Sequence, residues 1–328
     1  PACYAAGGDR PTLTDAFAVL GYVGQTDLGY DAVKLDIEAA RAAIDTLATP
    51  LQLSTEDAAE AIIKIAVSGM YLEVSKLVSS YGVDPRDNAL LAFGGAGPMT
   101  ACFLAEELNV ETVVVPVTPG VLSALGGLIA DLKNDFVTTV YADVGPDAVA
   151  VIREGFADLR SKGESWLRDE QGYDGPIRFL YSADMRYRGQ SFEIEAELDE
   201  AAIEKGDVRA LEESFHAAHE RLYTHADREA PVQMINLRLV TLGDSPKPRF
   251  EPAELTDGEA APAGRIKVHA GGAPQDCAHY RRDELEPGQH FNGPAVVTQS
   301  DTTVCVPAGF DGSVDGYGHL ILKRRSGE

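Results

Sequence analysis

The chain has 328 residues, 52 of them acidic and 28 basic, so its formal net charge is −24. Binding to nucleic acid needs clusters of Lys and Arg against the phosphates, and the sequence has none, which excludes nucleic acid as a partner. No apolar run approaches the roughly 20 residues that cross a bilayer, which excludes a membrane partner. At 45% hydrophobic residues the chain can bury ordinary globular cores.

The four cysteines are far apart and include no C-x-x-C pair; they are Cys3, Cys102, Cys277 and Cys305. This spacing argues against a thiolate metal site. Widely separated cysteines in a chain of this size suit a reducing compartment, and no secretory signal is visible. We therefore predict a cytoplasmic protein and no metal site.

Residues 1–145 are expected to form an α/β domain. Thr14 is expected to N-cap a short helix, with Asp15 in its first turn. An Ala-rich helix is expected over 31–48. The clearest helix begins at Ser54, which has capping-box spacing to Asp57, and stops before a Gly and a Pro.

Two short apolar runs, "NALLAF" and "TVVVPV", predict buried strands. Each is followed by a loop rich in Gly and Pro and then by a helix. Strand, helix, strand and helix in quick succession predict an α/β layer.

The loop "FGGAGPM" lies between the first of these strands and its helix. Gly allows a ligand to approach the backbone, and a helix N-terminus offers free N–H groups. However, the spacing is neither that of a Rossmann loop nor that of a P-loop. The residues alone leave two interpretations open, a tight turn and a ligand loop.

The second loop and helix, "TPGVLSALGGLIAD", carries Gly126 and Gly127 inside the helix. Each Gly costs about 1 kcal/mol relative to Ala, so we expect another backbone to pack closely there. A nucleotide-facing surface is the alternative.

Residues 146–245 are expected to form an α+β domain with strands that turn near Arg188. Asp184, Arg186 and Arg188 fall on one strand face, where Asp and Arg can pair across neighbouring strands. A solvated ion-pair face is expected there, and a substrate or subunit contact is the alternative. His216 and His219 lie one helical turn apart; hydrogen bonds in the core are expected, and a zinc site is the alternative.

Residues 246–328 begin with a connector rich in Pro, Gly and Ala and continue as short β-type runs. We expect a small C-terminal β module there.

Several segments in this order resemble one family. They are "PACYAAGG", "PTLTDAFAVLG", "YGVDPRDNALLAFGGAGPM", "VVVPVTPGVLSALGGLIADL", "ADMRYRGQSFEI" and "GPAVVTQSDTTVCVP". The ordered set is similar to the A-type subunit of the ATP-dependent hydantoinase/oxoprolinase family, which includes N-methylhydantoinase, 5-oxoprolinase and subunits of acetone and acetophenone carboxylases. The sequence departs from that pattern at Thr100 and at Ala5 and Ala6.

This resemblance implies the second lobe of an actin-like, sugar-kinase-like ATPase fold. It implies that Gly94, Gly95, Gly97 and Pro98 line adenine and ribose, and that Thr14 and Asp15 lie near the cleft between the lobes. Family members carry two phosphate loops upstream of the segment that matches this chain. ATP and Mg²⁺ would therefore be held mainly by an N-terminal A-type half, without which this chain would be inactive.

The expected function is a part or a split subunit of an enzyme that phosphorylates an amide or enolate oxygen before ring hydrolysis. The resemblance also implies a B-type hydantoinase or carboxylase subunit and a small amide or ketone substrate. Two alternatives stay open, a subunit of an ATP-dependent ketone carboxylase and a non-catalytic assembly subunit.

Overall fold

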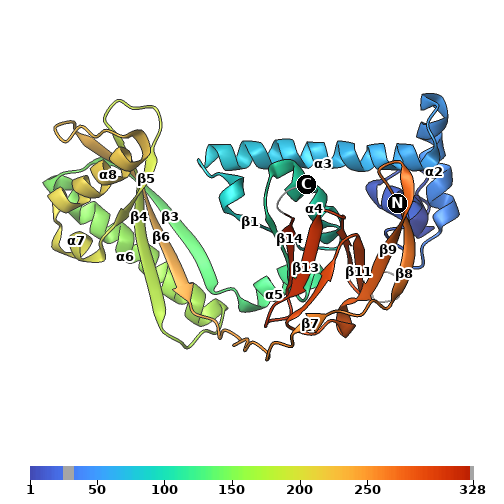
Figure 1. The fold of residues 1–328 in the computed structure, drawn as a ribbon. Helices are drawn as coiled ribbons and strands as arrows, with labels where there is room; N and C mark the ends of the chain where they lie inside the picture. The colour runs from blue at the N-terminus through green and yellow to red at the C-terminus, as the bar shows by residue number, and fades with distance from the viewer. Residues whose placement is uncertain (25–32, 326–328) are drawn as a thin grey trace. The chain divides into compact units, whose positions relative to one another are not determined.

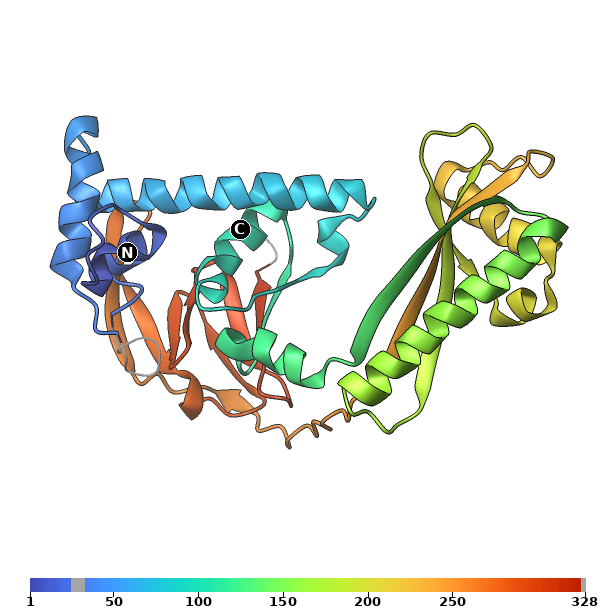
Figure 2. The ribbon, with the colours of Figure 1, turned by 180° about the vertical axis from the view of Figure 1, so that it is seen from behind.

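The computed structural model describes residues 1–24 and 33–325, and the chain divides into two compact units. The first unit combines Pro1–Gly127 with Arg249–Glu328, and the second is the continuous segment Leu128–Pro248. Figures 1 and 2 show both units from opposite sides. The predicted class, a combination of α/β and α+β structure, is confirmed.

The first unit contains a six-stranded sheet in the order β1-β2-β14-β13-β10-β7. Its strands are β1 (Ala89–Leu91), β2 (Thr112–Val115), β7 (Gly258–Glu259), β10 (Gln289–Asn292), β13 (Phe310–Val314) and β14 (Leu320–Arg324). β1 and β2 are parallel, and the C-terminal strand β14 is antiparallel to β2. The beginning and the end of the chain therefore build one sheet.

A second sheet of this unit has the order β12-β11-β9-β8. Its strands are β8 (Gly264–Ala270), β9 (Ala273–Arg281), β11 (Ala295–Gln299) and β12 (Thr302–Val306). The helices that begin in the first unit are α1 (Leu13–Val19), α2 (Ile37–Leu51), α3 (Thr55–Ser80), α4 (Gly97–Leu108) and α5 (Leu122–Ile129). The long helix α3 runs along one side of the unit (Figure 1).

The starts of α1, α2 and α3 follow the capping rules, with one correction to the sequence prediction. α1 is capped by Thr12, not Thr14, because Thr12 has the i, i+3 spacing to Asp15 that a reciprocal capping box requires. The prediction for α3 is confirmed: the Ser54 hydroxyl accepts from the Asp57 N–H. The Ala-rich helix predicted for 31–48 is α2, but it begins only at Ile37, after the N-cap Asp36, and it extends to Leu51. Residues 31 and 32 lie outside the described residues.

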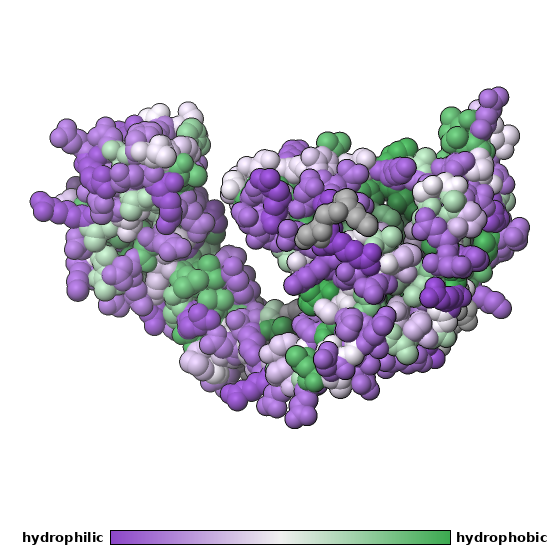
Figure 3. Space-filling view, in the orientation of Figure 1, coloured by the Kyte–Doolittle hydropathy of each residue, from purple (hydrophilic) through white to green (hydrophobic). Residues whose placement is uncertain are grey.

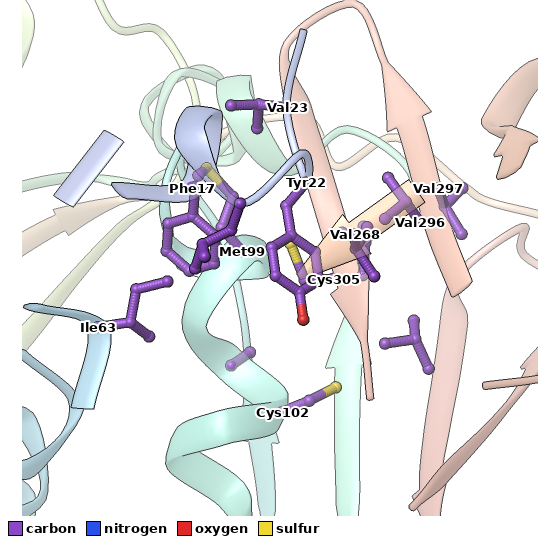
Figure 4. Packing of buried hydrophobic residues seen from close by; sticks show 14 of the residues in the cluster. Phe17, Tyr22, Val23, Ile63, Met99, Cys102, Val268, Val296, Val297 and Cys305 are labelled. Atoms are coloured by element: carbon purple, nitrogen blue, oxygen red, sulfur yellow. The ribbon is translucent and has the colours of Figure 1, made fainter. Parts of the chain in front are cut away.

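The core of the first unit lies between α1, α3, α4 and the β-sheets. Figure 4 shows Tyr22 beside Cys305 of β12, and Phe17 and Cys102 of α4 belong to the same core. All four cysteines of the chain are unpaired and buried. Burial raises the pKa of Cys277 to about 11, so its thiol stays protonated and behaves as a small apolar side chain.

The second unit is α+β. Its antiparallel sheet has the order β3-β6-β4-β5, with β3 (Leu132–Asp143), β4 (Ile177–Tyr187), β5 (Ile194–Leu198) and β6 (Val232–Gly243). It also contains the helices α6 (Val149–Ser165), α7 (Glu200–Lys205) and α8 (Val208–Tyr223). Phe156, Phe215 and Met234 are buried in its separate core. The predicted strand pair that turns near Arg188 is β4 and β5.

The surface seen in Figure 3 is mostly hydrophilic. Across 1–24 and 33–325, no helix combines the length and apolar character that crossing a membrane requires.

Candidate functional site

The loop between β1 and α4 is an open turn fixed by two distant segments. Gly94 has φ +80°, a conformation that favours glycine, and its N–H donates to the carbonyl of Pro119 at 2.8 Å. The carbonyl of Gly95 accepts from the hydroxyl of Thr302, also at 2.8 Å. A Cβ on Gly94 would meet no atom within 4 Å, and one on Gly95 would meet only the Asp301 carbonyl, at 3.7 Å. The loop therefore presents its backbone to open space.

This loop ends at the N-terminus of α4, which no side chain caps. The N-cap is Ala96, which makes no side-chain cap hydrogen bond, and the first turn holds no acidic residue. Pro98 occupies an early helical position where its missing N–H costs nothing, and it is buried. The positive end of the helix dipole is thus left for a ligand with acceptor groups.

A second segment, η3 (Pro119–Val121), lies against the turn between β11 and β12, which holds Asp301. The N–H of Gly120 donates to Asp301 Oδ2 at 2.8 Å. A Cβ on Gly120 would lie 2.6 Å from the Asp301 side chain, so only glycine fits this approach. The amide nitrogen of Gln299 donates to the carbonyl of Val117 at 2.8 Å.

Two acceptors beside this segment have unused hydrogen-bonding capacity. Asp301 Oδ1 and Gln299 Oε1 are buried, and neither has a hydrogen-bond partner among the described residues. Buried polar atoms are normally paired, and a bound molecule with donor groups would complete both acceptors. The ribose hydroxyls and the amino group of adenine are donors of this kind, whereas phosphate oxygens are not.

A pocket of 740 Å³ is lined in part by residues that flank this segment, Val117, Thr118 and Leu122. It is lined mainly by apolar and aromatic side chains, among them Leu122, Phe250 and Tyr317, and it also contains His319. The Nδ1 atom of His319 accepts from the Val117 N–H at 3.1 Å, which leaves Nε2 as the protonated nitrogen of the neutral ring. The pocket has the size and character of a small-molecule site.

Asp15 has a bracing role at the start of the chain. Its carboxylate accepts from the N–H groups of Ala2, Cys3 and Thr12 and from the Thr12 hydroxyl, at 2.8–3.1 Å. Burial acts to raise its pKa, but these hydrogen bonds outweigh it and lower the pKa below its usual value. In the described part of the chain no hydrogen bond joins Asp15 to the Gly94 loop. The expected position of Thr14 and Asp15 at an interlobe cleft stays a prediction.

The histidine pair of α8 is used in the core of the second unit. His216 Nδ1 lies 3.0 Å from the hydroxyl of Tyr187, and His219 Nδ1 donates to the carbonyl of His225 at 2.8 Å. The expected core hydrogen bonds are confirmed. Among the described residues no group of three or more His, Cys, Asp or Glu could hold a metal ion.

The predicted ion pairs in and beside β4 are present, but Asp184 and Arg186 are not solvated, because their side chains are only 14% and 15% exposed. Asp184 accepts from Arg238 and from Asn236, each at 2.8 Å. Arg186 pairs with Glu193 of the loop before β5, and Arg188 pairs with a residue of β3.

The expectation that another backbone packs against Gly126 and Gly127 of α5 is wrong within the described chain, because a Cβ on either would meet no atom within 4 Å.

The sequence prediction missed Asp301, Gln299 and Gly120 as parts of the site. A signal was available: the first two lie in "GPAVVTQSDTTVCVP", one of the segments that carried the resemblance. Asp301 meets Gly120 across 181 positions of the sequence, a contact that local patterns do not encode.

Comparison with known families decides the classification. The hydantoinase/oxoprolinase family model matches residues 1–136, and the hydantoinase/oxoprolinase C-terminal domain matches residues 142–325. The chain belongs to the hydantoinase/oxoprolinase family. The resemblance inferred from the ordered motifs is therefore confirmed.

The chain is similar to subunits of two kinds of ATP-dependent enzyme. It is 34% identical over 325 residues to the caprolactamase subunit alpha of Pseudomonas jessenii, covering 96% of this chain and 46% of that protein. The structure of ATP-dependent caprolactamase from that organism matches with a TM-score of 0.75 at 31% identity, covering 99% of this chain and 48% of that one. The nucleotide-free structure of acetone carboxylase matches with a TM-score of 0.81 at 27% identity, with the same two coverages. The chain thus spans about half the length of these relatives.

Proposed function

We propose that this chain is the adenosine-binding part of an ATP-dependent enzyme of the hydantoinase/oxoprolinase family. Gly94, Gly95 and Gly97 contact adenine and ribose from the loop that leads into α4, and the buried Pro98 fixes the first turn of the helix behind them. The observation that carries this proposal is the pair of unpaired buried acceptors, Asp301 Oδ1 and Gln299 Oε1, beside an uncapped helix N-terminus. Donors on the ribose and on adenine complement these acceptors.

The phosphates and Mg²⁺ are held mainly by the half of the protein that this chain does not span. The support is chemical. The free N–H groups of α4 suit an acceptor ligand, but the neighbouring atoms Asp301 Oδ1 and Gln299 Oε1 repel phosphate oxygens, and the first turn of α4 has no basic side chain to offset them. When bound, ATP supplies the phosphoryl group that turns an amide or enolate oxygen into a better leaving group. We infer that this chain alone does not hydrolyse ATP.

The reaction proposed for the complete protein is hydrolysis of a cyclic amide, with an N-terminal A-type half and a B-type subunit as partners. The similarity to a caprolactamase subunit supports this choice. Carboxylation of a ketone is the second candidate, and the TM-score of 0.81 to acetone carboxylase favours it. The 740 Å³ pocket with Leu122, Tyr317 and His319 is wide enough for either small substrate.

We also infer a cytoplasmic location, because four unpaired buried cysteines suit a reducing compartment. A functional division into an ATPase lobe at 1–145, an α+β domain at 146–245 and a connector with a β module at 246–328 stays a prediction, as do roles for Thr14 and Asp15 near the cleft.

The decisive experiment is calorimetric titration of the assembled protein with a non-hydrolysable ATP analogue. Gly95→Val should lower nucleotide affinity at least tenfold, because the new side chain fills the open face of the loop without a clash inside the chain. Gly264→Val, at a position in β8 where a Cβ also meets nothing within 4 Å, is the matched control and should bind normally. Unchanged affinity in Gly95→Val would contradict the adenosine assignment, and no binding by the wild-type assembly would leave the assembly-subunit alternative.

A further inference from the structure

One face of α3 carries a row of apolar side chains, which we call its seam. This seam continues past the end of the core that the helix covers. Positions 63, 67, 70, 74, 77 and 81 are all apolar or aromatic and alternate in steps of four and three, which keeps them on one helix face. Ile63 and Val67 are buried, and positions 70 and 74 are partly buried. In contrast, Leu77 is 57% exposed and Tyr81 is 77% exposed. The last two turns of the helix therefore present a core-type face with nothing beneath it in the described chain.

The strand that follows is an open sheet edge. β1 pairs only with β2, so its other side has no neighbour among the described strands. The N–H of Ala92 donates to the Val114 carbonyl, and because backbone groups alternate along a strand, the N–H and carbonyl of Leu91 point to the open side.

This edge lacks the features that normally protect an edge strand. Its residues, Ala89 to Leu91, include no charge and no proline, and Leu91 and Phe93 are about half exposed. The opposite edge, β7, has only two residues and one of them is Glu259. Parallel strands are usually buried on both sides, so β1 has the character of an interior strand.

The seam end and the open edge lie together. The chain turns back at the C-terminal end of α3, through η2 (Pro85–Asp87), and enters β1 directly, as both ribbon views show. Because only a short turn joins the end of α3 to β1, a strand added beside β1 would lie near the exposed end of α3, and one element could bury both features. We define the seam-edge surface as Leu77, Tyr81 and the outer side of 89–91.

We propose that the seam-edge surface binds a β-strand from the half of the hydantoinase/oxoprolinase protein that this chain does not span. The added strand pairs with the backbone of Leu91 and buries one apolar side chain against Leu77 and Tyr81. The occupant follows from length: the chain covers 46–48% of its relatives, and the surface needs a strand with an apolar face that the described residues do not supply. This inference rests on the proposed partnership with that other half.

Leu77→Asp, with Leu72→Asp as its matched control, tests the surface. Both residues are exposed leucines of α3, at 57% and 65%, but they point to different faces because they lie five residues apart, or 140° at 100° per residue. Calorimetry between this chain and the other half of the same protein should show at least tenfold weaker binding for Leu77→Asp and no change for Leu72→Asp. Equal effects of the two variants would overturn the proposal.

Leu91→Pro tests the edge, since it removes the outward N–H and no hydrogen bond to β2. It should weaken the same binding, and amides of 89–93 should become protected from hydrogen exchange on assembly. Amides that stay unprotected on assembly would overturn the strand pairing. If the chain associates with itself and Leu77→Asp abolishes that association, the surface binds a second copy instead. If the halves bind through this surface but no ATP analogue binds, the proposed function fails and the surface stands. If the ATP analogue binds but Leu77→Asp does not weaken the binding between the halves, the surface proposal fails and the proposed function stands.

Discussion

Replacing Asp15 by Asn should destabilise the first unit strongly at neutral pH. The carboxylate receives four hydrogen bonds that tie residues 2, 3 and 12 to the start of α1. An asparagine presents one acceptor and one NH₂ group, so it cannot accept on both sides. The N–H of Cys3, which bonds to Oδ1 at 2.8 Å, or the donors at Oδ2 would then face another donor.

The size of the effect follows from these contacts. A buried N–H left unpaired costs about 1–3 kcal/mol, and hydrogen bonds to a charged group contribute about 1.5–3 kcal/mol where neutral ones contribute about 1 kcal/mol. One lost bond and three weakened ones give a loss of about 4 kcal/mol in the free energy of unfolding. The control is Asp36→Asn, an exposed N-cap of α2 where Asn caps nearly as well as Asp, so its loss should stay below about 0.5 kcal/mol.

The pH dependence has a definite sign. The pKa of Asp15 is lowered in the folded protein, so its contribution is present above the ordinary carboxyl pKa of about 3.9 and is lost as pH falls through the folded value. The difference between wild type and Asp15→Asn should therefore be constant from pH 8 to 5 and shrink below about pH 4.

Urea unfolding can be followed in each unit separately. All four cysteines lie in the first unit, so thiol labelling of Cys277 and Cys305 reports its opening, and Trp166, the only tryptophan, reports the second unit by fluorescence. Asp15→Asn should shift the labelling midpoint and leave the Trp166 midpoint unchanged. A loss below 1 kcal/mol, or one independent of pH, would refute the bracing role.

Three further outcomes are expected. Tyr187→Phe should cost the second unit about 1–3 kcal/mol by urea unfolding, because it removes the acceptor of the Asp227 N–H and the partner of His216; an unchanged Trp166 midpoint would contradict this. Native Cys277 should resist maleimide at pH 8, because burial holds its pKa at about 11, and labelling faster than unfolding would oppose that reading. Asp301→Ala should lower adenosine affinity of the assembled protein about tenfold without changing pyrophosphate affinity, measured by calorimetry, and equal losses for both ligands would argue against a contact on the adenosine side.

Local features of the fold were predictable where the signal is local. The start of α3 at Ser54 and the loop between β1 and α4 follow from capping and turn chemistry, and the resemblance identified the family. The cap of α1 was misassigned because Thr12 and Thr14 both precede an apolar run; the i, i+3 spacing to Asp15 favours Thr12. The pairing of β14 with β2 could not be predicted, because strand pattern does not encode which distant strand becomes the neighbour.

The position of β14 beside β2 also determines which unit can fold first while the protein is being synthesised. The second unit is one continuous segment and has all its residues once Pro248 has left the ribosome. The first sheet cannot close at β2 until Leu320–Arg324 is made, some 200 residues after β2 itself. During translation, therefore, the apolar side chains of β2 and α4 stay uncovered while the inserted second unit is made and folds. In this interval the chain exposes the hydrophobic surface that chaperones bind.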